Sequence, residues 1–304
     1  MKQLILFSLT FFTSSLSFAQ INLEDSTVQV IGYWDKNETQ TYAITNEKYR
    51  VSGSDTTKRE FVTYEVDVTI KDSTANSYTI EWLYRHIDLD TDNPLIRKLA
   101  GISENMKILI KTDEMGALET VINWEEIRDE VKKSTAVLRN EFKHIPQIDA
   151  VVDKVDGMFS TREAIEALAI KDIRQFYTYH GGKYTLAEEI NGQLPVPNNL
   201  GGDPFNSDVT IRLDEINAED NNSVIWMWQT IDPEALTDAT YAYLKQNAGE
   251  TATFPARADF PEVQTEITTA ARIHGSGWVM YSRETKEVTA DGSLAFEERT
   301  IEIK

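Results

Sequence analysis

The chain of 304 residues carries 30 basic and 50 acidic residues, a net charge of −20, and contains no cysteine. Such a surface repels phosphate backbones and anionic lipid, which disfavours nucleic-acid binding. Without cysteine there can be no disulfides, so the fold must be stabilised by an apolar core.

The first 19 residues have the pattern of a secretory signal peptide. Lys2 supplies a positive charge, residues 4–12 form an apolar run, and Ser17 and Ala19 are small residues placed for cleavage before Gln20. The run is much shorter than the roughly 20 residues that span a bilayer, which argues against a membrane anchor. The sequence therefore predicts an exported protein, periplasmic or extracellular and soluble after cleavage.

Two distant segments of the chain repeat the same landmarks. Asp-Val-Thr-Ile-Lys at residues 67–71 recurs as Asp-Val-Thr-Ile-Arg at residues 208–212. Three pairs of landmarks keep offsets of 142, 141 and 144 residues: Tyr42 and Tyr184, Asp67 and Asp208, Trp82 and Trp226. A nearly constant offset of this length predicts an internal duplication rather than a solenoid repeat.

The predicted organisation follows from this duplication. It has a signal peptide at 1–19, a first copy at 20–123, a helical block at 124–182, and a second copy at 183–304 with an insertion at 234–266. Each copy is read as two strands, a helix and a hairpin. In each copy the helix begins with a polar cap followed by proline, as Asn93-Pro94 and as Asp232-Pro233.

Apolar residues alternate with polar ones along the predicted strands, which indicates sheets with one buried face. The helical block shows apolar residues three and four apart, so its helices must cover an apolar surface. These elements predict an α+β fold with an internally duplicated antiparallel sheet, strongly curved or a partial barrel, and helices on its apolar face. In outline the arrangement resembles the periplasmic lipoprotein carriers of the LolA and LolB type, whose curved sheet holds acyl chains.

Aromatic residues are the main candidates for a binding site. We expect a shared face for five of them and a contribution from a sixth at the end of the connection 195–208, namely Tyr78, Trp82, Tyr84, Trp226, Trp228 and Phe205. Large rings either fill a core or line a cavity, and both readings stay open.

Metal and catalytic patterns are weak in comparison. Asp88, Asp90 and Asp92 alternate as in a calcium loop, but Asn93 stands where an EF-hand has glycine. A solvated connection explains the same residues, so no cofactor is expected and calcium is the alternative. No nucleophile elbow or zinc ligand set occurs, which favours a binding protein over an enzyme.

Two functions fit these observations. The first is an envelope protein that binds an apolar or amphipathic small molecule in the concavity of the sheet. The second is an interaction or assembly factor that meets another envelope protein and takes no small ligand. A carrier requires an apolar cavity, whereas an assembly factor requires a filled core and an exposed apolar patch.

Overall fold

The computed structural model describes residues 20–53, 55–198, 200–248 and 254–304. The predicted signal peptide lies outside the described residues. Among the described helices, none is both long and apolar enough to cross a membrane.

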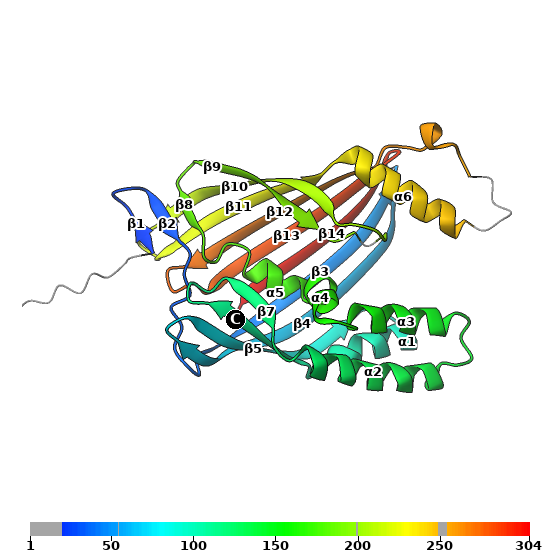
Figure 1. Ribbon diagram of the computed structural model, residues 1–304, viewed down its shortest axis with the longest axis horizontal. Helices are drawn as coiled ribbons and strands as arrows, with labels where there is room; N and C mark the ends of the chain where they lie inside the picture. The colour runs from blue at the N-terminus through cyan, green and yellow to red at the C-terminus, as the bar shows by residue number, and fades with distance from the viewer. Residues whose placement is uncertain (1–19, 54, 199, 249–253) are drawn as a thin grey trace, which may run out of the picture.

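One antiparallel sheet of 11 strands forms the body of the molecule (Figure 1). Its spatial order is β7-β6-β5-β4-β3-β14-β13-β12-β11-β10-β9, so the strands at the two ends of the chain pair in the middle. The strands are β3 (Thr39–Ser52), β4 (Asp55–Thr74), β5 (Ser77–Leu89), β6 (Lys107–Asp113), β7 (Leu118–Val121), β9 (Glu189–Val196), β10 (Phe205–Asn217), β11 (Asn222–Ile231), β12 (Gln264–His274), β13 (Val279–Ala290) and β14 (Ser293–Ile303). The sheet is strongly curved and its edge strands β7 and β9 do not pair, which confirms the predicted fold class.

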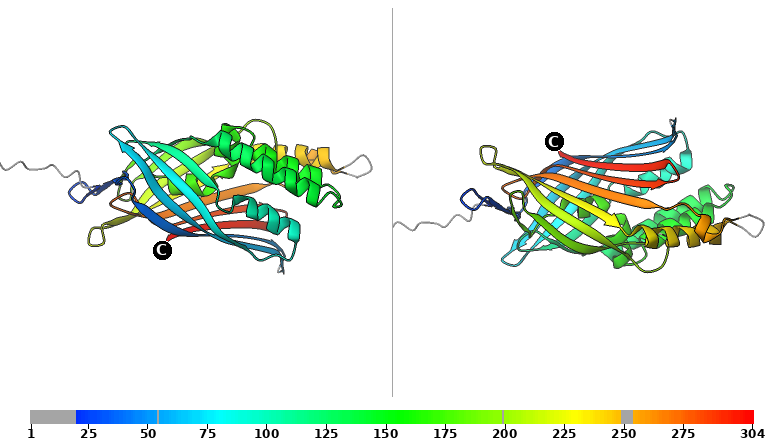
Figure 2. Two further views of the ribbon diagram at one scale, coloured as in Figure 1. Left: turned by 90° about the horizontal axis from the view of Figure 1, so that it is seen from below. Right: turned by 90° about the horizontal axis from the view of Figure 1, so that it is seen from above.

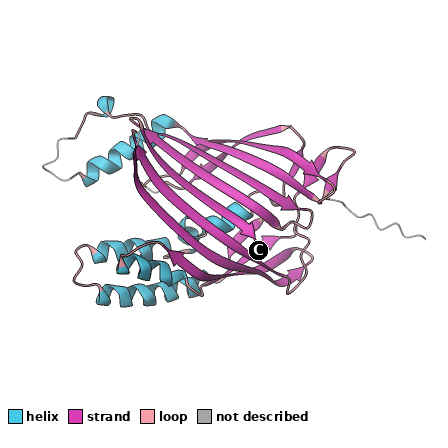
Figure 3. Cartoon of the chain, turned by 180° about the vertical axis from the view of Figure 1, so that it is seen from behind, coloured by secondary structure: helices cyan, strands magenta, loops and turns pink. Residues whose placement is uncertain are grey.

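The helices lie along the concave, inner face and at one end of the sheet (Figures 1 and 2). They are α1 (Pro94–Ala100), α2 (Trp124–Glu141), α3 (Ile148–Met158), α4 (Arg162–Ala164), α5 (Lys171–Phe176) and α6 (Pro233–Asn247), with 3₁₀ turns η1 (Gly101–Ser103) and η3 (Arg257–Asp259) and a π-helical turn η2 (Ile165–Ala169). The outer face of the sheet, seen in Figure 3, is left largely uncovered by these helices.

The first residues of the helices show which polar side chains cap a helix. The side chains of Asn93 and Asp232 accept hydrogen bonds from the first turns of α1 and α6, as predicted. The side chain of Asn123 does not cap α2, because its amide bonds to β6 instead, accepting from the backbone N–H of Leu109 at 2.8 Å. A side chain that bridges to a neighbouring strand cannot also cap its own helix.

A small sheet closes the end of the molecule opposite α6 (Figure 1). It contains β1 (Ile21–Asn22), β2 (Thr27–Gln29) and β8 (Lys183–Thr185). Beside it, Gly277 makes the turn between β12 and β13 with φ of +84°, and a side chain there would collide with the carbonyl oxygen of Ile31. Glycine is therefore required at residue 277 both by the backbone conformation of the turn and by the close approach of Ile31.

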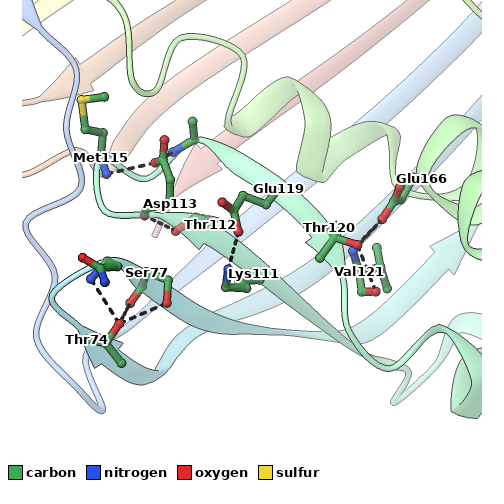
Figure 4. Close-up of polar contacts among 12 residues, drawn as sticks. Thr74, Ser77, Lys111, Thr112, Asp113, Met115, Glu119, Thr120, Val121 and Glu166 are labelled. Atoms are coloured by element: carbon green, nitrogen blue, oxygen red, sulfur yellow. Dashed lines mark hydrogen bonds and ion pairs between the residues drawn. The ribbon is translucent and has the colours of Figure 1, made fainter.

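The π-helical turn η2 is tied to the edge strand β7 (Figure 4). Its Glu166 carboxylate accepts hydrogen bonds from the hydroxyl of Thr120 and the backbone N–H of Val121, both at 2.8 Å. These bonds satisfy polar groups at a strand edge that would otherwise be open. They also fix the position of the chain that leads into α5.

His180 follows α5 and is buried among aromatic rings. Its Nε2 donates to the carbonyl oxygen of Gly277 at 2.8 Å, and its ring stacks on Phe176 with 6.0 Å between centroids. Burial lowers the pKa of His180 from 6.5 to about 4. The folded protein therefore holds this imidazole neutral at pH values where the unfolded chain protonates it.

We predict that the burial of His180 makes the folded protein less stable as the pH is lowered from 6.5 to 4. Above pH 6.5 the imidazole is neutral in both states, and between pH 6.5 and 4 only the unfolded state binds the proton, which costs roughly 3 kcal/mol of stability across that window. Urea unfolding of His180→Gln at a series of pH values should lack this slope. The matched variant His144→Gln, at an exposed site, should keep it, and an unchanged slope in His180→Gln would contradict the assignment.

Candidate functional site

Helix α5 fills one half of the concavity. The ring of Phe176 packs edge-on against Tyr42 and against Trp82, with 5.3 Å between centroids in both pairs. All three side chains are fully buried. This half of the inner face, which we call the plugged half, is therefore packed core rather than a binding cavity.

The six predicted ligand-binding residues are not brought together. Tyr78 packs against Trp34 and Trp82 lies in the plugged half. Phe205 packs against the small apolar cluster beneath α6. Of the six, only Tyr84 lines one of the cavities on the inner face.

Trp226 and Trp228 lie on the outer face of the sheet, so their expected alignment with Trp82 is wrong. Their neighbours Ile225 and Met227 are buried, whereas Trp228 is 37% exposed. The two indole rings stack on each other with 5.9 Å between centroids.

The pairing of the hairpins explains the difference. Val68 is opposite Trp82 in β5, but Val209, its expected counterpart, is opposite Gln229 in β11. Gln229 comes three residues after Trp226. Because side chains alternate between faces, an odd shift moves a residue to the opposite face.

Two adjoining cavities occupy the other half of the inner face, which we call the trough. The proximal cavity, next to α5, has a volume of about 250 Å³ and is lined by Asn46, Val62, Tyr64, Tyr84, Ile87, Ala100, Ser103, Leu168, Ala169, Lys171, Asp172 and Arg299. The distal cavity has about 270 Å³ and is lined by Lys48, Tyr49, Arg50, Glu60, Lys286, Val288, Ala295, Phe296 and Glu297. They adjoin because Arg299 and Glu297 are two residues apart on the same face of β14.

Asp172 is the buried carboxylate of the proximal cavity. It accepts hydrogen bonds from Tyr84 Oη at 2.9 Å and Tyr64 Oη at 3.2 Å, and from the backbone N–H of Ile173 at 2.9 Å. Burial raises the pKa of Asp172, while the charge of Arg299 and these donors act in the opposite direction. The side chain is thus held firmly but is less acidic than an exposed aspartate.

Arg299 is the buried cation of the trough, with 3% of its surface exposed. Its guanidinium donates to Glu284 Oε1 at 3.0 Å and lies 3.6 Å from Glu297 Oε1. Gln175 of α5 donates to the backbone carbonyl of Arg299. Buried charges require such pairing, so this network positions α5 on β13 and β14.

The side of the proximal cavity that faces Asp172 and Arg299 is apolar. It is formed by Val62 on β4, Ile87 on β5, Ala100 at the end of α1, and Leu168 and Ala169 in the π-helical turn. π-Helical turns recur at functional sites because the extra residue redirects side chains. Here the turn places Leu168 on the apolar wall and leads directly to Lys171 and Asp172.

The three aspartates considered as an alternative calcium loop are exposed. Asp88 is near the end of β5, and Asp90 and Asp92 lie on the connection to α1. Nowhere in the described part of the chain do three histidine or acidic side chains converge as metal ligands.

A third cavity, of about 670 Å³, is lined mainly by outer-face side chains of β9 to β13 and by the start of α6. Four of its side chains are acidic, Asp208, Asp232, Glu266 and Glu287, and they are joined mainly by polar neighbours. Because it lacks an extended apolar wall, this surface is less suited to an apolar ligand than the trough.

The prediction from aromatic residues did not include the charged residues of the trough, such as Asp172 and Arg299. A signal for them existed in strand alternation, since Ile301 and Ile303 on β14 share a face with Arg299 and Glu297. In β3, Tyr42 and Ile44 share a face with Asn46 and Lys48. Charged residues in phase with buried ones mark a polar region of an inner face.

No protein-family model matches this chain, and no curated protein matches it. Among solved structures, a lipovitellin chain studied for lipid–protein interactions aligns with 89% of this chain at 10% identity and a TM-score of 0.39. This chain spans 25% of that lipovitellin chain. A hot dog fold protein of unknown function from Alicyclobacillus acidocaldarius aligns with 87% of this chain and 79% of its own, at 10% identity and a TM-score of 0.11. Similarities this low do not bear on function.

We predict that the two classes of tryptophan differ in their contribution to stability. Trp82→Ala, in the plugged half, should cost about 3 to 5 kcal/mol. Trp228→Ala removes an exposed stacking partner and should cost about 1 kcal/mol. Urea unfolding followed by circular dichroism provides both values, and equal costs would contradict the placement of Trp228 on the outer face.

Proposed function

We propose that this protein is an exported carrier that binds an amphipathic small molecule in the trough. The observation that supports the proposal is the two-sided character of the proximal cavity. One side carries Val62, Ile87 and Leu168, and the other carries Asp172 and Arg299. An amphipathic molecule needs an apolar wall and fixed polar groups in one site.

The size of the trough agrees with such a ligand. Each cavity alone is slightly below the range of about 300 to 1,000 Å³ that is typical of small-molecule sites, and together they fall within it. The plugged half supports the same role, because its packed core provides a rigid base on which the trough residues are held.

Export is part of the proposal and rests on the pattern of residues 1–19. The expected cleavage site agrees with the fold, since Gln20 is buried and its carbonyl oxygen accepts from the backbone N–H of Gln29 at 2.9 Å. A chain that begins at Gln20 would retain the whole small sheet.

An alternative role in protein interaction is favoured by one observation. The edge strand β9 is almost entirely exposed, and its Ile190 and Leu194 are each 46% exposed. A free edge of this kind can pair with a strand of another protein. Under that alternative the trough has no ligand.

The test uses protein expressed with residues 1–19 and recovered from the exported fraction, where its intact mass should correspond to a chain that begins at Gln20. The probe is N-phenyl-1-naphthylamine, an uncharged dye whose fluorescence rises in apolar sites. We expect saturable binding to the wild type. Ala100→Trp, which fills the proximal cavity, should weaken binding at least about tenfold.

The control is Thr285→Trp, which adds the same ring to the outer face of β13 and should leave dye binding unchanged. Absence of saturable binding by the wild type, or equal binding by both variants, would exclude the trough as the site. Retention of Met1 in the recovered protein would exclude cleavage at Gln20.

A further inference from the structure

The carboxylates of the trough are engaged by neighbouring donors. Asp172 accepts from two tyrosines, and Glu284 accepts from Arg299. Glu297 lies 3.1 Å from the ammonium of Lys48. Burial alone would raise the pKa of Glu297, but the charges of Lys171 and Lys48 lower it. These acids are therefore already compensated by the protein itself.

Two cations of the trough are not compensated in this way. Within the described residues, no carboxylate oxygen lies within ion-pair distance of Lys171 or Lys286. Lys171 begins α5 and lines the proximal cavity, while Lys286 is on β13 and lines the distal cavity. Helix α5 contacts β13, so the two ammonium groups extend from neighbouring elements.

Three of the four charged groups that shift the pKa of Lys171 are cations. Loss of hydration lowers this pKa, the charge of Glu297 raises it, and the charges of Arg299, Lys48 and Lys286 lower it. The two cavities of the trough are lined by more cations than carboxylates, namely Lys48, Arg50, Lys171, Lys286 and Arg299 against Glu60, Asp172 and Glu297. This lining occurs in a chain whose acidic residues outnumber its basic ones by 50 to 30. Cations gathered on the inner face of such an acidic protein require an explanation beyond solubility.

The register of the strands brings these charges into one row. Across the inner face, Lys286 is opposite Glu297, and Glu297 is opposite Lys48. Glu297 thus has a lysine opposite it on each neighbouring strand but makes its ion pair with Lys48, and Lys171 lies nearby on α5. The row continues into the polar side of the proximal cavity, opposite its apolar wall, because Glu297 and Arg299 are consecutive inner-face residues of β14.

We infer that the ligand of the trough is an amphiphile with an anionic head group, a carboxylate or phosphate held by the ammonium groups of Lys171 and Lys286. This inference rests on the proposed function of the trough. The apolar chain contacts Val62, Ile87 and Leu168 in the proximal cavity. The negative charge of the head group then pairs with the positive charges of Lys171 and Lys286.

The experiment measures displacement of N-phenyl-1-naphthylamine by three ligands with the same ten-carbon chain: decanoate, decyl phosphate and decanol. The two anions are used below their critical micelle concentrations and decanol below its solubility limit. Decanoate and decyl phosphate should each displace the dye at concentrations about tenfold lower than decanol, because only they form charge-assisted hydrogen bonds. Comparison of the two anions distinguishes a carboxylate from a phosphate head group. Added salt should weaken both anions and leave decanol unchanged.

Variants assign the effect to the two lysines. Lys171→Gln and Lys286→Gln should each weaken decanoate binding about fivefold or more while decanol binding is unchanged. Lys183→Gln, an exposed lysine on β8 at the other end of the molecule, is the matched control and should behave as the wild type.

The outcomes separate the inference from the proposed function. If the dye binds but decanol competes as well as both anions, or if decyltrimethylammonium competes best, the anionic head group is excluded and the amphipathic site remains. If the lysine variants bind decanoate as the wild type does, the assignment to Lys171 and Lys286 is overturned. If the dye does not bind at all, the proposed function fails and the inference fails with it.

Discussion

The position of α5 on the inner face of the sheet is the constraint on which the rest of the structure depends. Its single aromatic residue, Phe176, fills half of the concavity together with Tyr42 and Trp82. Protein interiors are close-packed, so this half leaves no room for a ligand. The same helix begins with Lys171 and Asp172 and thereby forms the boundary of the trough. A short helix thus divides one curved sheet into a core and a candidate site.

The polar contacts of the trough depend on that placement. Gln175 reaches the carbonyl oxygen of Arg299, and Glu166 fixes the preceding turn to the edge strand β7. Burial raises the pKa of Asp172, and Tyr84 and Tyr64 fix its carboxylate by hydrogen bonds. More cations than carboxylates line the two cavities, although the protein as a whole is strongly acidic. Repulsion from the acidic surface would slow the approach of an anionic ligand, and the ion pairs within the trough would act mainly on its release.

Much of the fold could be predicted from the sequence because it depends on local periodicity. Alternation of apolar and polar residues predicted strands with one buried face, and Asn93 and Asp232 marked helix starts that the structure confirms. The internal duplication stays a prediction. The faces of Trp226 and Trp228 could not be obtained in this way, because they depend on hairpin pairing that is shifted by three residues relative to the repeat. Register is a property of the paired strands and not of either segment alone.

The candidate site was harder to predict for a related reason. Asp172 and Arg299 are 127 positions apart in the chain and meet only after α5 packs on β14. Polar residues such as these are usually exposed, although each lies on the buried face of its own helix or strand. The aromatic residues were more visible in the sequence, but most of them build the core.

The most direct test of the central claim is a crystal structure of the protein with decanoate at saturation. The account predicts the carboxylate about 3 Å from the Nζ atoms of Lys171 or Lys286, with the chain against Val62 and Leu168. Decanoate bound beside Trp226 and Trp228 on the outer face, with the trough free of ligand density, would contradict it.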